Sequence, residues 1–600
     1  MGWIQGHDPP HSVATTALWN GHDAPRLVGT SPPSVRSVAD RGLRLAVVGD
    51  CYASHAELRS GLCAIRAEDW RGLTRWPGSY WVIARRGPWT TILSDVCGSR
   101  PVYYTHHHGR LRWATRTRPL AELTKAALDD AALIAQLTCP TIAEATEDRT
   151  TYAGIHRLPG GHALVTDGVT LRVTPYEPET PTATFTEAAA ALRAALGTAV
   201  YCRATTVKQL SADVSGGLDS TSLALLAEPH VQSSFLGITR LDSTSDNDDS
   251  YYARRCAAEA PRMRHVVTPG DDARMFDQLD AAPDTDQPLS DAARWAITAS
   301  YRQLLREHGS HLHLTGSGGD TLLEAAPYHL AEAYRTQPRR VFRAQAVAFA
   351  QLRQLAPRAV ARAARTQART TYRDALLHLA DQVSTPAWSR RRRGAAERIA
   401  WCGTVGFAAW LTSPARRTLA EHLRAHAEQA YLSVPLATHR AWSELREFGT
   451  YQAELTQQLD HDGLATHTPY LDNEVVRACM ALPVSHRHRP GTQKPLLGAA
   501  LHGLVPEFLL ARTTKGAYDG NAYSGLRRNA ARLRTLLTES RLVERGIVDP
   551  APVRSDLDRL TVGAPGPVAA LERLVSMELW LSRNHARSGA PSTVEEHHAH

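Results

Sequence analysis

The stretch KQLSADVSGGLDSTSLALLAE, residues 208–228, constrains the fold more than any other part of this 600-residue chain. LSADV is typical of a short buried strand, and STSLALLA is typical of a helix. Ser215, Gly216 and Gly217 stand between them, followed by Leu218, Asp219 and Ser220. Two glycines let a backbone approach a ligand closely, and the amide groups of such a loop converge near the helix start. This strand–loop–helix unit predicts an α/β domain with an anion-binding loop.

The carboxylate in this loop points to a specific chemistry. Asp219 would repel a phosphate, but it suits a Mg²⁺ ligand that bridges to phosphate oxygens. Ser215 and Ser220 add hydroxyl donors. The loop is not a Walker P-loop, because it lacks the G-x-x-x-x-G-K-[ST] pattern. A bare Gly-Gly pair could be only a turn, whereas the complete SGGLDS favours a nucleotide site.

A second glycine-rich segment, LHLTGSGGDTLLEA, follows another apolar run. It contains Gly316, Gly318, Gly319 and Asp320. Carboxylates on two such loops could hold one Mg²⁺ against a triphosphate. We therefore expect Asp219 and Asp320 to be the metal ligands and to act together in catalysis.

These motifs resemble those of a known superfamily. SGGxDS is similar to the pyrophosphate-binding loop of ATP pyrophosphatases, which adenylate a substrate and release AMP and pyrophosphate. The second loop resembles that of asparagine-synthetase-type enzymes. FLGITRLDSTSDNDDSYYARRCAAE, HTPYLDNEVVRACMALP and KPLLGAALHGLVPEFLLARTTKGAYDG resemble further segments of that family, in its order.

The resemblance implies ATP and Mg²⁺ as cofactors. It places Gly237 and Gly318 near the nucleotide, together with Ser215, Gly216, Gly217, Asp219 and Ser220. It also implies that Lys515 is the catalytic lysine, whose cation would stabilise the charge on the tetrahedral species and on departing pyrophosphate. The alternative for Lys515 is a solvated loop lysine.

The first part of the chain has the pattern of a β-rich domain. LRLAVVGD, SYWVIARR, WTTILSD and PVYYTHHHGRLRWAT are β-branched or aromatic runs separated by turn residues. YEPETPTATF is typical of a linker, and Thr184 with Glu187 forms a capping box that predicts a helix start. We expect an α/β protein with an α+β N-terminal β-sandwich domain at 1–180, a helix-rich α/β domain at 181–590, and a polar tail at 591–600.

The N-terminal domain resembles the glutaminase domain of asparagine synthetase B. The resemblance lies in MGWIQG, PGSYWVIA, LSDVCGSRPVYY, RLRWAT, GIHRLPGGHAL and PYEP. In those glutaminases a cysteine at position 2 attacks glutamine, and its α-amine is the base. Here position 2 is Gly2, which cannot form an acyl-enzyme, and Cys51 and Cys63 would lack the free α-amine. We therefore expect a glutamine-independent enzyme whose attacking amine comes with the substrate.

Two groups of this superfamily lack that cysteine, the β-lactam synthetases and the lasso-peptide cyclases. The chain is longer than the former, with an Arg-rich helical insertion at about 332–430. FAAWLTSPARRTLAEHL resembles a segment of lasso cyclases. Ser317 replaces the tyrosine or glutamate expected before the second aspartate, and Ala465 and His467 replace an expected Glu–Arg pair. His467 is a conceivable general base, although a lone histidine is more often structural.

The favoured function is that of a lasso-peptide cyclase. Such an enzyme adenylates an Asp or Glu side chain of a leaderless precursor peptide and joins it to the N-terminal amine. The implied partners are the precursor (core) peptide, a leader peptidase and a leader-binding protein. A β-lactam-type amide ligase, a tRNA-modifying ATP pyrophosphatase and a catalytically dead scaffold remain as alternatives, in that order.

Composition limits the remaining classes. The net charge is +8, and the eight cysteines contain no C-x-x-C pair, which argues against a zinc site and suits a reducing cytosol. No apolar run reaches the roughly 18 residues that span a bilayer. We expect a cytoplasmic protein that binds neither membrane nor nucleic acid. The Arg-rich stretch could guide an acidic peptide or a partner protein, or be a solvated helix face.

Overall fold

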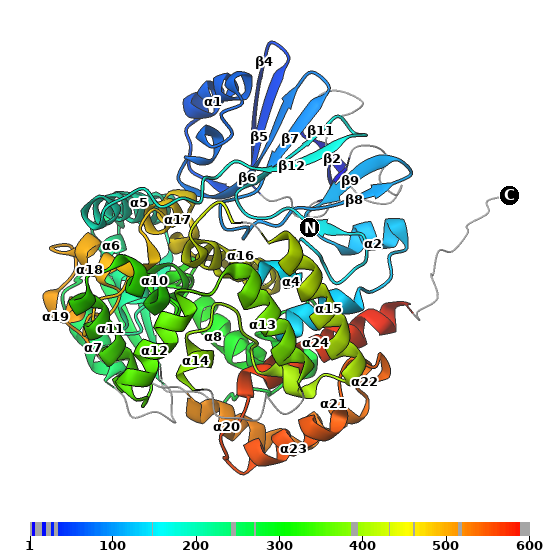
Figure 1. Cartoon of the computed structure of the whole chain (residues 1–600). Helices are drawn as coiled ribbons and strands as arrows, with labels where there is room; N and C mark the ends of the chain where they lie inside the picture. Colours follow the sequence, from blue (N-terminus) through cyan, green and yellow to red (C-terminus); the bar gives the residue numbers. More distant parts are fainter. Residues whose placement is uncertain are drawn as a thin grey trace.

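The computed structural model has two parts, a strand-rich N-terminal part and a helix-rich remainder (Figure 1). The structure describes residues 3–5, 15–19, 26–28, 34–146, 148–241, 248–268, 272–385, 394–430, 432–459, 463–513 and 519–588. The expected tail at 591–600 lies outside these ranges.

The N-terminal part is built on a six-stranded antiparallel sheet of order β12-β11-β7-β6-β5-β4. Its strands are β4 (Val35–Asp40), β5 (Leu43–Cys51), β6 (Gly78–Arg86), β7 (Trp89–Leu93), β11 (His162–Thr166) and β12 (Leu171–Pro175). The strands expected from LRLAVVGD, SYWVIARR and WTTILSD are therefore confirmed. The run PVYYTHHHGRLRWAT forms the hairpin of β8 (Tyr103–His107) and β9 (Arg110–Ala114), which β10 (His156–Arg157) extends.

Both faces of the large sheet are buried. Successive side chains of β5 point alternately to two different hydrophobic cores. Leu45 and Val47 point to a core shared with α1 (His55–Ala67). Ala46 and Val48 point to the other core, which contains Trp113 from the β8–β9 hairpin. A separate three-stranded sheet pairs β3 (Arg26–Val28) with β1 (Trp3–Gln5) and β2 (Thr15–Ala17). The expected sheet-on-sheet packing is thus confirmed on one face, and a helix covers the other.

The predicted linker joins the two parts. The described residues between β12 and α5 (Phe185–Thr206) form no helix or strand. Thr184 accepts a hydrogen bond from the Glu187 amide (3.3 Å), and Glu187 accepts one from the Thr184 amide (2.8 Å), so the capping box is confirmed.

The remainder contains a five-stranded parallel sheet of order β15-β14-β13-β16-β17. Its strands are β13 (Leu210–Asp213), β14 (Phe235–Arg240), β15 (Met263–Thr268), β16 (Leu312–Leu314) and β17 (Ala465–His467). The chain builds outward from β13 through β14 to β15 and then returns to place β16 on the other side of β13. The carboxyl ends of β13 and β16 therefore meet at a topological switch point, where α/β sheets bind their ligands.

Helices make up most of the rest of the described chain. They include α3 (Asp130–Thr138), α6 (Leu218–Ala227), α7 (Asp249–Ala258), α8 (Trp295–Glu307), α9 (Gly319–Leu323), α16 (Leu436–Leu459), α17 (Asn473–Met480), α18 (Pro495–Leu501), α20 (Asp519–Arg528), α21 (Ala530–Thr538), α22 (Arg541–Glu544), α23 (Pro550–Thr561) and α24 (Val568–Ser588). None of the described helices is long and apolar enough to cross a bilayer.

The Arg-rich insertion is helical, as predicted. It contains α10 (His329–Thr336), α11 (Arg339–Leu352), α12 (Pro357–Gln367), α13 (Tyr372–Ser384), α14 (Ala395–Arg398) and α15 (Ser413–Gln429). Alanines explain much of this helicity, because alanine has the highest helix propensity of any residue. The run SRRRRG lies mostly outside the described residues.

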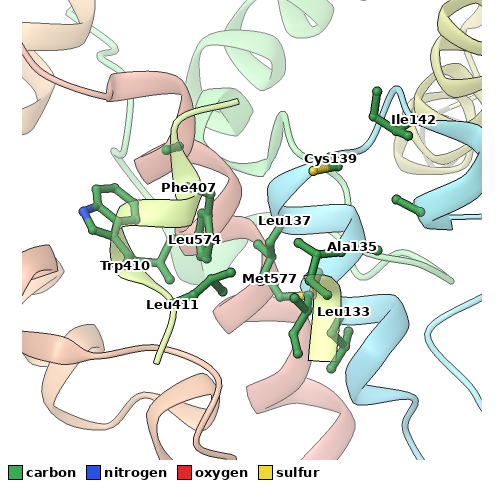
Figure 2. Close-up of a cluster of buried hydrophobic side chains, with 14 of the residues drawn as sticks. Leu133, Ala135, Leu137, Cys139, Ile142, Phe407, Trp410, Leu411, Leu574 and Met577 are labelled. Carbon is green, nitrogen blue, oxygen red and sulfur yellow. The ribbon is translucent and has the colours of Figure 1, made fainter. Parts of the chain in front are cut away.

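The tryptophan-containing segment expected from FAAWLTSPARRTLAEHL is part of the largest core. Figure 2 shows Phe407 and Trp410 in one cluster with Leu137 of α3 and Leu574 of α24. Trp410 is fully buried, and its indole N–H donates to Asp556 (2.9 Å). This segment therefore connects elements that lie far apart in the sequence.

Candidate active site

The SGGLDS loop connects β13 to α6 as predicted. Gly216 has a φ of +77°, and a Cβ there would lie 2.2 Å from the Asp249 carbonyl oxygen, so only glycine fits. The Ser215 and Ser220 hydroxyls are 2.7 Å apart, and the Gly217 amide donates to Ser215 Oγ (3.2 Å). These contacts fix a compact loop at the N-terminus of α6, a ready site for an anion.

The second loop, between β16 and α9, packs directly against the first. A Cβ at Gly316 would lie 2.7 Å from the Ser220 amide nitrogen, and one at Gly319 would lie 2.6 Å from Asp219 Cγ. Gly318 has a φ of +88°, and a Cβ there would approach a Leu471 methyl group to 2.8 Å. The glycines of the second loop thus allow the two loops to meet.

Lys494 joins the two loops. Lys494 is the N-cap residue of α18. Its ammonium group contacts both Asp219 Oδ2 and Asp320 Oδ1. The Lys494 side chain is only 6% exposed, whereas that of Asp320 is 58% exposed. Burial lowers the pKa of Lys494, but attraction to the two carboxylates outweighs it, so the net pKa is raised. The lysine is therefore held as a cation.

The two predicted metal ligands thus share one cation, and that cation is a lysine. Among the residues that the structure describes, no group of three or more His, Cys, Asp or Glu side chains is placed to hold a metal. This donor set still fits Mg²⁺, which one or two carboxylates hold together with substrate phosphates and water. The Mg²⁺ role of Asp219 and Asp320 remains a prediction.

Arg512 anchors the first loop from behind. It donates to the Gly216 carbonyl (2.7 Å) and to Asp248 (2.6 Å), and it contacts Asp249 at the start of α7. Its side chain is buried and lies over the Tyr252 ring, 4.4 Å from the centroid. Arg512 therefore fixes the glycine loop against α7 through hydrogen bonds to charged and backbone groups.

Comparison with known proteins now identifies the group to which this architecture belongs. A family model described as asparagine synthase matches residues 191–582, more than half of the chain. The chain belongs to the asparagine synthase family. Membership indicates an ATP-using carbon–nitrogen ligase.

The other comparisons add little to this. A solved glutamine phosphoribosylpyrophosphate amidotransferase from B. subtilis, complexed with ADP and GMP, is similar over 49% of this chain and 68% of that one. The identity is 12% and the TM-score 0.18, a likeness on which no argument rests. No curated protein matches the chain.

Two predicted site residues of this asparagine synthase family member, Gly237 and Lys515, are not seen at the two glycine-rich loops. Gly237 lies inside β14, where a Cβ would approach Met263 Sδ to 2.5 Å, so side-chain packing accounts for the glycine. Its nucleotide contact remains a prediction. Lys515 lies outside the described residues, and its catalytic role also remains a prediction.

His467, the conceivable general base, has a side chain that is 10% exposed and lies at the boundary between the two parts of the chain. Arg203 donates to its Nδ1 (3.1 Å), and its Nε2 lies 3.5 Å from Asp50 of β5. Burial is the main cause that lowers the pKa of His467 to about 4; Asp50 opposes this, and Arg203 and Arg100 add to it. These contacts give His467 a structural role, because a weakly basic, enclosed imidazole is a poor proton acceptor.

Lys494 and Arg512 are the functional candidates that sequence reasoning did not single out. Both residues belong to the segment KPLLGAALHGLVPEFLLARTTKGAYDG, which resembles a C-terminal segment of the family. The signal that could have identified Lys494 is that a carboxylate pair needs a counter-charge when no metal is bound. Ser317 and Ala465 are placed nearby: Ser317 donates to Gln452 of α16 (3.0 Å), and Ala465 begins β17.

Proposed function

We propose that this asparagine synthase family member is a lasso-peptide cyclase, an AMP-forming ligase that closes a macrolactam within a peptide. It would activate an Asp or Glu side-chain carboxylate of a leaderless precursor peptide. The N-terminal amine of the same peptide would then attack the activated carbonyl. A leader peptidase and a leader-binding protein would supply the leaderless peptide.

The observation that most supports a nucleotide-activating site is the Asp219–Lys494–Asp320 arrangement. It joins two glycine-rich loops at the switch point of a parallel sheet, where ligands bind. One carboxylate is nearly buried and the other is half exposed, so the arrangement opens to solvent on the Asp320 side. A ligand can therefore reach the charges without unfolding the loop.

The proposed chemistry has two steps. In the first, a peptide carboxylate oxygen bonds to the α-phosphorus of ATP, and the bond to pyrophosphate breaks. In the second, the peptide amine bonds to the acyl carbon, AMP departs with the electron pair of the broken C–O bond, and the amine loses a proton. Holding the amine and the acyl group in one folded peptide makes the second step intramolecular, an advantage of several kcal/mol.

The residues of the chain have separate roles in these steps. The amides of the SGGLDS loop would bind phosphate oxygens, and Arg512 would keep that loop rigid. Lys494, held as a cation, would stabilise negative charge on the departing pyrophosphate. Asp219 and Asp320 would hold Mg²⁺, which when bound supplies charge neutralisation of the triphosphate.

The glycine at position 2 supports independence from glutamine. A glutaminase of this type needs a thiol at that position, and glycine has no side chain. The strand-rich N-terminal part packs against the synthetase part through His467, Arg477 and α16. This domain is therefore proposed to support the site structurally.

The test is incubation of the full-length protein with Mg-ATP and a leaderless peptide that has an Asp or Glu a short way from its N-terminus. Mass spectrometry would follow loss of one water, and a parallel assay would follow AMP and pyrophosphate. We expect peptide-dependent AMP and a dehydrated product whose fragmentation shows an isopeptide. AMP with small β-amino acids and none with peptides would contradict the peptide substrate.

Variants test the site itself. Asp219→Ala, Asp320→Ala and Lys494→Ala should each lower the rate of AMP release by about a hundredfold or more. Lys125→Ala is the matched control, because Lys125 also has a left-handed backbone (φ 52° against 42° for Lys494) but is exposed. Unchanged AMP release in Lys494→Ala would remove the proposed role of that cation.

A further inference from the structure

Two helices of the Arg-rich insertion expose a dense set of arginines. We call this set the arginine face; it consists of Arg339, Arg340 and Arg343 on α11 and of Arg358, Arg362, Arg365 and Arg369 along and just after α12. All seven are exposed. The two helices pack on each other and on α10.

The spacing of the arginines follows the helix period. Arg358, Arg362, Arg365 and Arg369 are separated by four, three and four residues, which places them on one side of the helix. The opposite side of α12 buries Val360. On α11 the buried residues include Phe342, Ala346 and Phe349, which share a core with α12. The four arginines on and just after α12 therefore lie away from its buried side, and the three on α11 are exposed near the N-terminal end of that helix.

The arginine face has no acidic partner. From residue 333 to residue 373 the sequence contains no Asp or Glu. None of the seven arginines forms an ion pair or a side-chain hydrogen bond with any residue that the structure describes. Like charges three or four residues apart on a helix repel one another. The face is thus a concentrated positive charge that the fold itself does not neutralise.

Another helical surface of the same chain provides an internal comparison. On α20, α21 and α23, four exposed arginines have a carboxylate partner: Arg528 with Asp272, Arg532 with Asp280, Arg534 with Asp558, and Arg559 with Asp556. Arg527 and Arg554 on the same helices are exposed without one among the described residues, so this surface is mostly, not wholly, paired. A solvated helix face in this protein therefore carries both signs of charge. The arginine face departs from that pattern, so solvation alone does not explain it.

We propose that the arginine face docks an acidic polypeptide segment with interspersed apolar residues. Guanidinium groups match carboxylates in bidentate geometry. Val347 (41% exposed), one helical turn after Arg343 on α11, supplies apolar contact beside that arginine, and Leu352 at the end of the helix is also exposed (74%). Tyr334 of α10 (38% exposed) is the one exposed aromatic side chain of residues 333–373, so a row of stacking platforms, on which single-stranded nucleic acid binding relies, is not present there.

The face lies close to the candidate active site along the chain. α10, which packs against both arginine-bearing helices, begins at His329, shortly after Asp320. The face belongs to the segment that matches the asparagine synthase family model, so a docked acidic segment would be held on the synthetase part of the molecule. This proposal does not depend on the peptide substrate proposed above.

The test uses the full-length protein and a fluorescein-labelled peptide of about twenty Glu, Asp and Leu residues. Fluorescence anisotropy at low salt would give its Kd, and binding should weaken steeply as salt rises. We expect Arg358→Gln/Arg362→Gln/Arg365→Gln to weaken binding at least about tenfold. The matched control is Arg528→Gln/Arg532→Gln/Arg534→Gln, which removes the same charge from the paired surface and should leave Kd within about twofold.

Three outcomes would overturn the proposal. The first is no binding of the acidic peptide by the wild-type protein. The second is equal weakening by both triple variants, which would show attraction to net charge alone. The third is tighter binding of a single-stranded RNA of matched charge, which would assign the face to nucleic acid. Melting temperatures of both variants would establish that each is folded.

Discussion

The arginines of the boundary between the two parts of the chain differ sharply from those of the arginine face. At the boundary, Arg477 is buried and donates to Glu177 (2.6 Å) and to the Thr74 carbonyl (2.9 Å). On the arginine face, Arg362 is exposed and has no described ion-pair partner. The same residue type thus fixes the fold in one place and leaves a charged surface in the other.

The difference lies in what surrounds each guanidinium. A buried guanidinium has lost its hydration and depends on its partners, so losing one partner leaves an uncompensated charge. An exposed guanidinium remains hydrated and contributes little to stability. Arginine content therefore predicts neither stability nor function, and measurements on single variants can separate the two kinds of region.

The largest effect is expected for Arg477→Ala. Burial disfavours the charge of Arg477, but hydrogen bonds and attraction from Glu177 outweigh it and raise the pKa. The variant would leave the buried Glu177 with Arg71 (3.2 Å) as its remaining cation, and we expect the free energy of unfolding to fall by about 3 kcal/mol. Chemical denaturation of wild type and variant would measure the change.

The double variant Arg477→Met/Glu177→Gln provides the control, because it removes both charges. It should be less destabilised than Arg477→Ala alone. A double variant that is as unstable as the single one would show that packing, and not the weaker pairing of the Glu177 carboxylate, determines the loss.

The next effect is a pH dependence at the same boundary. The pKa of His467 is lowered from 6.5 to about 4, mainly by burial, with Asp50, Arg203 and Arg100 around it. Between these values the unfolded chain binds a proton at His467 and the folded chain does not, so stability falls as pH decreases. The lowering corresponds to a loss of about 3 kcal/mol from pH 6.5 to pH 4.

His467→Gln tests this sign directly, since glutamine does not titrate. Denaturation curves between pH 7 and pH 4 should show a smaller loss of stability in the variant than in the wild type. Parallel curves for the two proteins would mean that His467 is protonated in the fold, contrary to its enclosure by two arginines.

The local features of the fold could be predicted from the sequence. The β5 and β6 strands, the capping box at Thr184 and the SGGLDS loop all depend on short patterns, and each is present. The proximity of Asp219 and Asp320 followed from two glycine-rich loops after apolar runs. Parallel strands bring such loops to one edge of a sheet, so this prediction needed only local information.

The long-range contacts could not be predicted. Glu177 and Arg477 are 300 residues apart, and Lys494 meets Asp219 across 275 residues. No periodicity in a single sequence encodes such a pairing, because it depends on how α17 and α18 dock. For the same reason the sequence alone does not tell whether His467 is a general base or a structural residue. Its contacts with Arg203 and Asp50 in the fold favour the structural role.

An intermediate effect is expected for Arg446→Ala, since Arg446 is partly exposed. It donates to Glu179 (2.6 Å) and to the Gly160 carbonyl (3.1 Å), and its side chain is 23% exposed. Losing hydrogen bonds of this kind should lower the unfolding free energy by about 1.5 kcal/mol. The urea midpoint would measure it, and a loss equal to that of Arg477→Ala would break the proposed dependence on burial.

The smallest effect should have the opposite sign. Arg362 lies between Arg358 and Arg365 on the same side of α12, so it forms two like-charge pairs. Arg362→Gln removes both and keeps a residue of similar helix propensity, and we expect a gain of a few tenths of a kcal/mol. The melting temperature should rise slightly at low salt and the gain should vanish at high salt, because salt screens exposed charges. A fall in melting temperature at both salt concentrations would mean that Arg362 stabilises the fold, and the arginine face would then resemble the boundary.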